Sequence, residues 1–363
     1  MGAFSTGIAF GESGPRKDTR VAPLAAPLSR RGFVAISVGS LAGLVLSGCS
    51  TQGASSKAIE KKANGKLVVH LGDQPSYFVP KVADRKGFFK KEFEKDGIEI
   101  KVDNFVNQGS AIIEAMKAGN LPIGVIGALP TISADASGSK FKFIASVNYS
   151  VDGFRLYASK QSKVTKVADL KGKTVGVKFS SSEHQMVLTL LSNNGLSPKD
   201  VHVVNMSAED CLSSVLSGKA DAALLRSEQI KPAEDGGAVE LATNKETGLI
   251  VSYLVATEQF LKEHGDVAVR IIRVMYDTCR WMYQHEDEAI KIFAEETKTD
   301  EASARVGFDS RKRGVSVREE VLRDTVQQSI DFSIDQKLIA KRVDIDDVVD
   351  SSYFNQAKVK DDE

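Results

Sequence analysis

The sequence predicts an α/β protein built from two α/β lobes, with a helical C-terminal tail. Strand and helix patterns alternate from residue 65 to about residue 241, and such alternation is typical of α/β units with parallel strands. Between residues 257 and 297 the pattern becomes helical almost throughout, and helical signals continue over 317–339. The length of 363 residues fits two domains or one two-lobed body.

Short β-branched or alternating runs indicate strands, and apolar residues at helical spacing indicate helices. We expect strands at 66–71, 98–105, 122–126, 141–147, 173–178, 201–206 and 221–225. We expect helices at 76–95, 110–119, 182–193 and 208–216. Residues 149–158 and 242–254 lie at the edges of the second block and are expected to cross between the lobes. One lobe is therefore predicted from 66–150 plus 250–363, and the other from 151–249.

The N-terminal segment carries the pattern of an export signal. Residues 29–33 read SRRGF, which is similar to the twin-arginine signal, although a general secretory signal also carries basic residues. The apolar stretch 33–46 that follows is too short for a stable spanning helix and fits a signal peptide. It ends in LSGC at 46–49, which resembles a bacterial lipobox. We therefore expect residues 1–48 to be removed, Cys49 to be lipidated, and 49–64 to form a flexible tether. The alternative is a plain N-terminal anchor with an incidental cysteine.

Composition and motif searches exclude several function classes. The 48 basic and 48 acidic side chains cancel, so nothing indicates a nucleic-acid partner. The cysteines, three in number, form no CxxC pair and no zinc spacing. The GKT triplet at 172–174 lacks the first glycine of a P-loop and precedes its strand. No GxSxG or HExxH occurs, so the sequence predicts no metal, no cofactor and no catalysis.

Four segments in order resemble the nitrate/sulfonate/taurine and thiamine-precursor group of periplasmic binding proteins. They are VADRKGFF at 82–89, QGS through AMKAG at 108–119, VADLKGKTVGV at 167–177 followed by SSSEH at 180–184, and LSGKADA at 216–222. The resemblance covers residues 66 to about 304. It implies the two-lobed type II periplasmic binding protein fold, with two crossing segments. It also implies an extracytoplasmic receptor of an ABC importer, which binds a small-molecule ligand and delivers it to permease and ATPase subunits.

The ligand class implied by the resemblance is a small organic anion such as a sulfonate, taurine or nitrate. The sequence departs from the family pattern at two places expected to face the ligand. Ser180 stands where glycine is usual, and LRSE at 225–228 stands where an aromatic residue and Asp-Pro are frequent. A thiamine-type pyrimidine ligand and a sensory lipoprotein without a permease therefore stay open. For a pyrimidine, stacking residues would be Tyr77, Phe78, Phe154 and Phe179.

Hydroxyl groups gather at two predicted helix starts, where unpaired backbone N–H groups favour anions. Ser110 begins one helix, and Ser181 and Ser182 begin another, with Gln185 placed to complete a capping box. Simple capping is the alternative role for these serines. The candidate ligand-binding residues are Gln74, Ser76, Gln108, Gly109, Ser110, Ser181, Ser182, His184 and Arg226.

Arg226 ends a predicted strand and is the candidate charge partner of the anion. The alternative is a surface arginine paired with Glu228 or Glu234. Arg155, on a crossing segment, is a second candidate. Glu183 must point away from the cleft if the anion hypothesis is to hold, because its carboxylate competes for the same helix start. Trp281, Tyr276 and Tyr283 lie on an amphipathic helix and are expected to be core residues.

Overall fold

Two β-sheets organise the part of the chain that the structure describes. This computed structural model describes residues 59–359, apart from 63, 64, 75, 76, 78, 106–108, 151, 249 and 311–318. All of them belong to one compact unit, Gly53–Glu363. The predicted export signal, Cys49 and most of the predicted tether lie outside the described residues.

The first sheet has the strand order β1-β2-β4-β11-β5, and β3 pairs with β2. Its strands are β1 (Ile59–Lys61), β2 (Leu67–Asp73), β3 (Ile98–Asn104), β4 (Ile123–Ile126), β5 (Phe141–Ser150) and β11 (Ile250–Thr257). β2 runs parallel to β3 and β4, whereas β11 runs antiparallel to β4 and β5. The chain therefore returns to this sheet after forming the second one.

The second sheet has the order β10-β6-β9-β7-β8. Its strands are β6 (Phe154–Ala158), β7 (Thr174–Val177), β8 (His202–Asn205), β9 (Ala222–Arg226) and β10 (Val239–Thr243). β7 is parallel to β8 and β9, and β6 is antiparallel to β9 and β10. The chain passes from the first sheet to the second between β5 and β6, and back between β10 and β11. The predicted two-lobed α/β class is confirmed; we call each sheet with its helices a lobe.

Helices cover both sheets. The second sheet carries α5 (Ser182–Asn193), α6 (Ala208–Ser217) and α7 (Ser227–Asp235). The other helices are α1 (Val79–Arg85), α2 (Phe88–Phe93), α3 (Gly109–Lys117), α4 (Ala128–Ala136), α8 (Glu258–Gln284), α9 (Glu286–Thr297), α10 (Glu301–Asp309), α11 (Glu319–Asp335), α12 (Ile345–Val348) and α13 (Ser352–Ala357). The prediction of one helix over 76–95 was wrong. Gly87 has a φ of 70°, a left-handed conformation that ends the first helix and separates it from the second.

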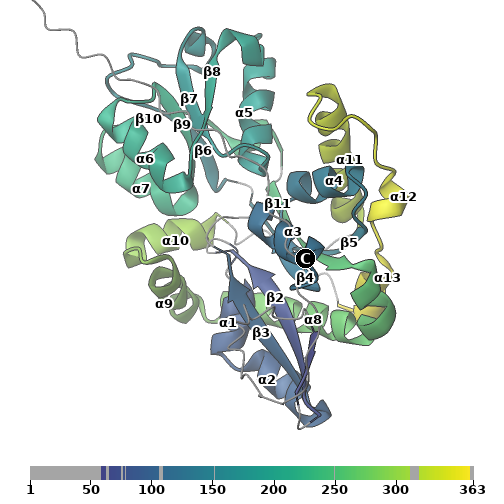
Figure 1. The fold of residues 1–363 in the computed structure, drawn as a ribbon. Helices are drawn as coiled ribbons and strands as arrows, with labels where there is room; N and C mark the ends of the chain where they lie inside the picture. The colour runs from purple at the N-terminus through teal and green to yellow at the C-terminus, as the bar shows by residue number, and fades with distance from the viewer. Residues whose placement is uncertain are drawn as a thin grey trace, which may run out of the picture. The chain divides into compact units, whose positions relative to one another are not determined.

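Alternating side chains of the second sheet face two different helix layers. Leu156, Val175 and Leu224 share a buried cluster with α5 residues such as Leu190. Tyr157, Ala223 and Leu225 point to the opposite face, where Cys211 of α6 and Ile230 of α7 cover them. Figure 1 shows α5 on one side of this sheet and α6 and α7 on the other. Because β7 and β9 are neighbouring parallel strands, the starts of α5 and α7, which follow them, lie at the same edge of the sheet.

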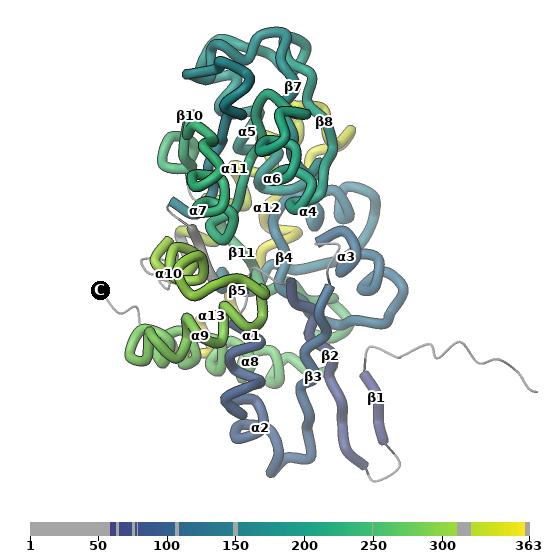
Figure 2. Tube along the Cα trace, turned by 90° about the vertical axis from the view of Figure 1, so that its left-hand side faces the viewer, coloured from purple at the N-terminus to yellow at the C-terminus, as the bar shows by residue number. Residues whose placement is uncertain are grey.

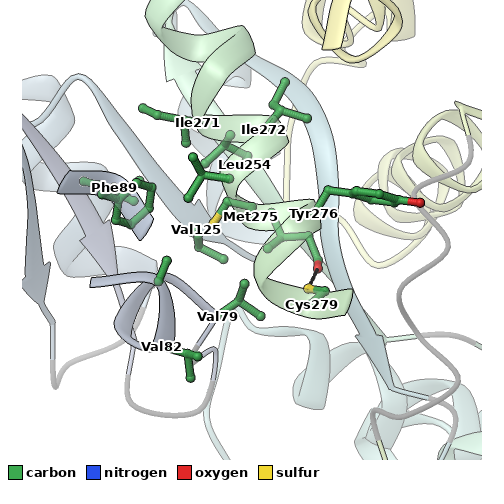
Figure 3. Close-up of a cluster of buried hydrophobic side chains, with 14 of the residues drawn as sticks. Val79, Val82, Phe89, Val125, Leu254, Ile271, Ile272, Met275, Tyr276 and Cys279 are labelled. Atoms are coloured by element: carbon green, nitrogen blue, oxygen red, sulfur yellow. Dashed lines mark hydrogen bonds between the residues drawn. The ribbon is translucent and has the colours of Figure 1, made fainter. Parts of the chain in front are cut away.

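One of the two buried clusters of the first lobe lies between its sheet and α1, α2 and α8; the other lies under α3, α4 and α11. Figure 3 shows Val79, Val82 and Phe89 from the two short helices facing Leu254 of β11 and Met275 of α8. Tyr276 belongs to this cluster, and Trp281 and Tyr283 pack against it as partly buried residues. The expectation that these three aromatic residues serve packing is confirmed.

Two helices of the C-terminal region also contact the second lobe. Val306 of α10 packs against the cluster beneath α7, and Figures 1 and 2 both place α10 beside α7. Phe332 of α11 packs against the α5 cluster, and the Ser329 hydroxyl donates to Gln185 at 3.4 Å. The helical tail is therefore shared between the lobes, in addition to the two chain crossings.

Candidate functional site

One cavity of about 280 Å³ takes residues from both lobes. The first lobe contributes Gln74, Tyr77, Gly109, Ser110, Ile113, Glu114, Lys117, Gly127, Pro130, Ser133, Ala134 and Ser137. The second contributes Lys178, Phe179, Ser180, Ser181, Ser182, Glu183 and Arg226. The carboxyl ends of β2, β4, β7 and β9 lead directly into this lining, which is where open α/β sheets bind ligands.

Four helices begin at the cavity wall. α3 contributes its first residue Gly109, α5 contributes its first residue Ser182, and α4 and α7 contribute the residues just before them, Gly127 and Arg226. Each helix start presents backbone N–H groups without intrahelical partners and carries about half a positive charge. At Gly109 a Cβ would lie 2.8 Å from Ile126 Cγ2, so only glycine allows α3 to begin this close to β4.

Ser181 acts as the N-cap of α5. Its hydroxyl accepts the His184 N–H at 3.3 Å and donates to the Lys178 carbonyl at 2.7 Å. The predicted capping box between Ser182 and Gln185 was wrong, because the helix begins one residue earlier than that box requires, with Ser181 as its N-cap. The local hydrogen bonds of Ser181 therefore favour the capping alternative for this residue, although it does line the cavity.

Ser182 and Ser110 lie in the same cavity wall on different helices. Within the described part of the chain, the Ser182 hydroxyl makes no hydrogen bond, and a Cβ on Gly127 would approach it at 3.2 Å. Gln74 is buried, and its side-chain amide donates to the Val125 carbonyl at 3.0 Å. The structure thus brings together six of the nine predicted ligand residues: Gln74, Gly109, Ser110, Ser181, Ser182 and Arg226.

Glu183 does not point away from the cleft, so the condition that the sequence analysis set for the anion hypothesis is not met. Glu183 lines the cavity, and its Oε1 accepts from Arg226 Nε at 2.8 Å and from Nη2 at 2.5 Å. Both side chains are largely buried, with exposed fractions of 9% for Glu183 and 11% for Arg226. Burial raises the pKa of Glu183, but the guanidinium charge together with backbone and Ser181 hydrogen bonds outweighs it, so this pKa lies below its ordinary value. Arg226 is therefore paired with Glu183, and Glu228 adds a further favourable charge near the guanidinium. Because Arg226 neutralises the Glu183 carboxylate, an anion site at this wall stays compatible with Glu183 in the lining.

Two predicted polar candidates lie away from the cavity lining. Arg155 donates to Glu240 at 2.7 Å and lies 3.5 Å from Asp152, so its role is an ion-pair network at the edge of the second sheet. His184 is 8% exposed and does not line the cavity. Burial lowers the pKa of His184, and its ring stacks on Phe179 at a centroid distance of 4.7 Å. His184 therefore supports a lining residue from behind.

Lys178 is a cavity residue that the sequence reasoning missed. It follows β7 directly and lines the cavity, and its position at a strand end was the available signal. Lys117 and Glu114 also line the cavity and lie 3.4 Å apart as an ion pair. Within the described residues, the structure shows no ion pair for Lys178. It is therefore the lining cation best placed to neutralise a bound anion.

The aromatic candidates divide into three groups. Tyr77 and Phe179 line the cavity. Phe154 was a wrong candidate, because it is buried in the α5 cluster. Phe78 lies outside the described residues, as do the predicted ligand residues Ser76 and Gln108.

The two described cysteines do not line the cavity. Cys211 and Cys279 are both buried, and burial raises the pKa of each thiol to about 12. Among the described residues, no group of three or more His, Cys, Asp or Glu side chains is arranged to hold a metal ion. In the same part of the chain, no helix has the length and apolar character needed to cross a membrane.

Comparison with known proteins agrees with the fold. Residues 75–289, more than half of the 363-residue chain, match the family described as NMT1/THI5 like. The chain belongs to this family. The NMT1/THI5-like chain is 27% identical over 321 residues to a Bacillus subtilis protein provisionally named an aliphatic sulfonates-binding protein, a match that covers 86% of this chain and 93% of the relative.

Solved structures resemble the NMT1/THI5-like chain over most of its length. The alkanesulfonate-binding protein SsuA of Xanthomonas axonopodis pv. citri bound to MOPS has a TM-score of 0.71 and 21% identity, over 78% of this chain and 97% of that one. The desulfurization enzyme DSZB, solved with biphenyl-2-sulfinic acid, matches with a TM-score of 0.64 and 15% identity, over 80% of this chain and 98% of that one. Together with the cavity, the binding-protein relatives support a solute-binding role.

Proposed function

We propose that this protein is the extracytoplasmic solute receptor of an ABC importer and that it captures a small organic anion of the sulfonate class without catalysing a reaction. The observation that carries this proposal is the convergence of four helix starts, those of α3, α4, α5 and α7, on one cavity. Helix N-termini bind anionic groups through backbone N–H donors and the helix dipole. The names of the relatives, which refer to sulfonates, support the same ligand class.

The charges in the lining support a monoanion. Lys117, Lys178 and Arg226 face Glu114 and Glu183, so three cations minus two carboxylates leave a single positive charge. Because Arg226 and Lys117 already form ion pairs within the wall, Lys178 takes the role of charge partner that the sequence analysis gave to Arg226. Ser182 and Ser110 then supply hydroxyl groups to the bound acid.

Calorimetry on wild type and Lys178→Gln tests this assignment, with taurine, hexanesulfonate, hexanoate and neutral hexanol as ligands. Loss of a charge-assisted hydrogen bond should weaken binding of the acids by about tenfold to a hundredfold. Lys171→Gln is the matched control, since Lys171 is 75% exposed and outside the cavity. If no acid binds, or if Lys178→Gln binds like wild type, the anion receptor proposal is wrong.

Capture by closure of the lobes is part of the same proposal. The lobes are proposed as 66–150 with 250–363 and as 151–249, because the chain passes between the sheets twice, at β5–β6 and at β10–β11. Two crossings form a hinge that lets a cleft close on its ligand. Small-angle scattering should show a smaller radius of gyration once a ligand is bound. A radius unchanged by a ligand that demonstrably binds would contradict the hinge.

Attachment to the membrane is proposed through an acylated Cys49. It is supported by the SRRGF segment, the apolar stretch and LSGC at 46–49 in the sequence, and a lipid on a tether would hold the receptor beside its permease. Cys49→Ala should release the protein or stop its processing. If Cys49→Ala protein is still matured and retained at the membrane, the anchor proposal is wrong. Loss of uptake on deletion of a neighbouring permease gene would separate an importer receptor from a sensory lipoprotein.

A further inference from the structure

Phe179 presents its aromatic ring to the cavity. It is 39% exposed, which is high for a phenylalanine beside a buried strand, and it lines the cavity between Lys178 and Ser180. An exposed aromatic ring forgoes a large part of its hydrophobic stabilisation. A ligand that covers this ring would recover it.

The ring is held in place by its surroundings. Its face stacks on the His184 imidazole with an interplanar angle of 17° and a centroid distance of 4.7 Å. The Phe179 N–H donates to the Asn205 side chain at 2.9 Å, which ties the loop to the end of β8. Ser180 adopts a left-handed backbone with a φ of 54°. These constraints present the ring in a defined orientation rather than leaving it to adapt to the solvent.

The rest of the lining adds apolar surface on the first lobe. Ile113 of α3 and Pro130 and Ala134 of α4 line the cavity together with Tyr77. The cavity volume of about 280 Å³ equals about nine liquid water volumes, which is more space than a two-carbon acid needs. The residue before Phe179 is the cation Lys178. The wall therefore combines an anion site, a fixed aromatic ring and apolar side chains.

We propose that the preferred ligand is an anion carrying a flat aromatic group, an arylsulfonate or aryl carboxylate, and that Phe179 determines this preference by stacking on it. The inference rests on the proposed function, because it takes the cavity to bind an organic acid. Stacking of aromatic groups contributes binding free energy beyond the burial of their area. His184 stacks on the Phe179 ring, and 39% of the residue stays exposed for contact with a ligand. Aliphatic acids of equal size lack this contribution.

The test compares benzenesulfonate with cyclohexanesulfonate, and benzoate with cyclohexanecarboxylate, by calorimetry. Each pair has the same carbon skeleton and charge, so the affinity ratio reports on the flat ring. Wild type should bind the aromatic member about three- to tenfold more tightly. Phe179→Leu should reduce this ratio to less than twofold, whereas Phe179→Tyr should keep it. Phe88→Leu, which changes a phenylalanine packed on Trp281 in the first lobe, should leave the ratio unchanged.

The possible results separate this inference from the proposed function. If wild type binds both members of each pair equally, or if Phe179→Leu keeps the full ratio, the aromatic preference is wrong while the anion receptor proposal stands. If neither sulfonates nor carboxylates bind, or if neutral benzyl alcohol binds as tightly as benzenesulfonate, the anion receptor proposal itself fails. A melting temperature of Phe179→Tyr equal to that of wild type would show that the variant still folds.

Discussion

The Arg226 guanidinium donates from Nε and Nη2 to one carboxylate oxygen of Glu183, at 2.8 and 2.5 Å. Arg226 ends β9 and Glu183 lies in the first turn of α5, so the pair joins two elements of the second lobe at the cavity wall. Largely buried pairs of this kind stabilise a fold weakly as a whole, but removal of one member leaves a buried charge without its partner.

A double-mutant cycle over Glu183→Gln and Arg226→Gln measures both roles of this pair. Each single change should lower the free energy of unfolding by about 3–5 kcal/mol, and the double variant should lose less than the sum. For an anionic ligand, Arg226→Gln should weaken binding, whereas Glu183→Gln should strengthen it because a competing carboxylate is removed. Denaturant unfolding and calorimetry provide the two readouts. If Glu183→Gln weakens binding as strongly as Arg226→Gln, Glu183 contacts a cationic part of the ligand.

Neighbouring serines at the start of α5 should separate stability from binding. Ser181→Ala removes an N-cap and should lower the free energy of unfolding by about 1 kcal/mol, with affinity within about twofold of wild type. Ser182→Ala removes a cavity hydroxyl that caps nothing, so it should leave stability unchanged and weaken binding by about two- to tenfold. Thermal unfolding and calorimetry on the same samples check the contrast. Equal effects of both variants on affinity would assign ligand contact to Ser181 as well.

The left-handed backbone at Ser180 predicts a stabilising substitution. Residues with a side chain avoid a φ of 54°, and the left-handed region disfavours them by roughly 1–2 kcal/mol relative to glycine. Ser180→Gly should therefore be more stable than Ser180→Ala by about 1 kcal/mol, since alanine keeps the strain and glycine relieves it. Denaturant midpoints measure the difference. Gly172, at a φ of 72°, provides the reverse control. Gly172→Ala should be less stable than wild type, because it introduces a side chain at a left-handed position.

Periodicity predicted the sheets well because it reports burial. The strand expected at 221–225 is β9, whose Leu224 and Leu225 face opposite helix layers. The prediction of a helix over 76–95 failed because the apolar spacing continued through Gly87, where the backbone turns left-handed. Apolar spacing alone cannot predict that a single glycine separates two short helices.

The cavity wall was predicted from strand ends and helix starts, which are local features. Ser110, Ser182 and Arg226 meet in the cavity for this reason. The partner of Arg226 was mistaken because Glu183 lies 43 residues away, and only the spatial adjacency of β9 and α5 brings them together. Lys178 was missed for a different reason. Its role depends on which other cations of the cavity wall form ion pairs with carboxylates, and these pairs cannot be read from the sequence.

Asp73 predicts a pH dependence of stability opposite to that of a surface carboxylate. It is fully buried at the end of β2, 3.8 Å from Lys81, and burial raises its pKa to about 7 although Lys81 opposes this. The folded state therefore binds the Asp73 proton more tightly than the unfolded chain, whose aspartates titrate near 4. The stabilisation of the folded state by protonated Asp73 is fully present below about pH 4 and is lost as the pH rises toward 7.

Asp73→Asn removes this titration, so its stability relative to wild type should rise by about 1–3 kcal/mol between pH 5 and pH 7. The readout is the change with pH of the stability difference between Asp73→Asn and wild type. The absolute stability is not the readout, because the variant also leaves Lys81 without its carboxylate at every pH. Asp169→Asn is the control: hydrogen bonds from Thr165 lower the pKa of Asp169, so its difference from wild type should stay constant over this range. Urea unfolding of the three proteins at several pH values gives the comparison. A flat difference for Asp73→Asn would mean that Asp73 stays ionised in the folded protein, held by Lys81 as a closed ion pair.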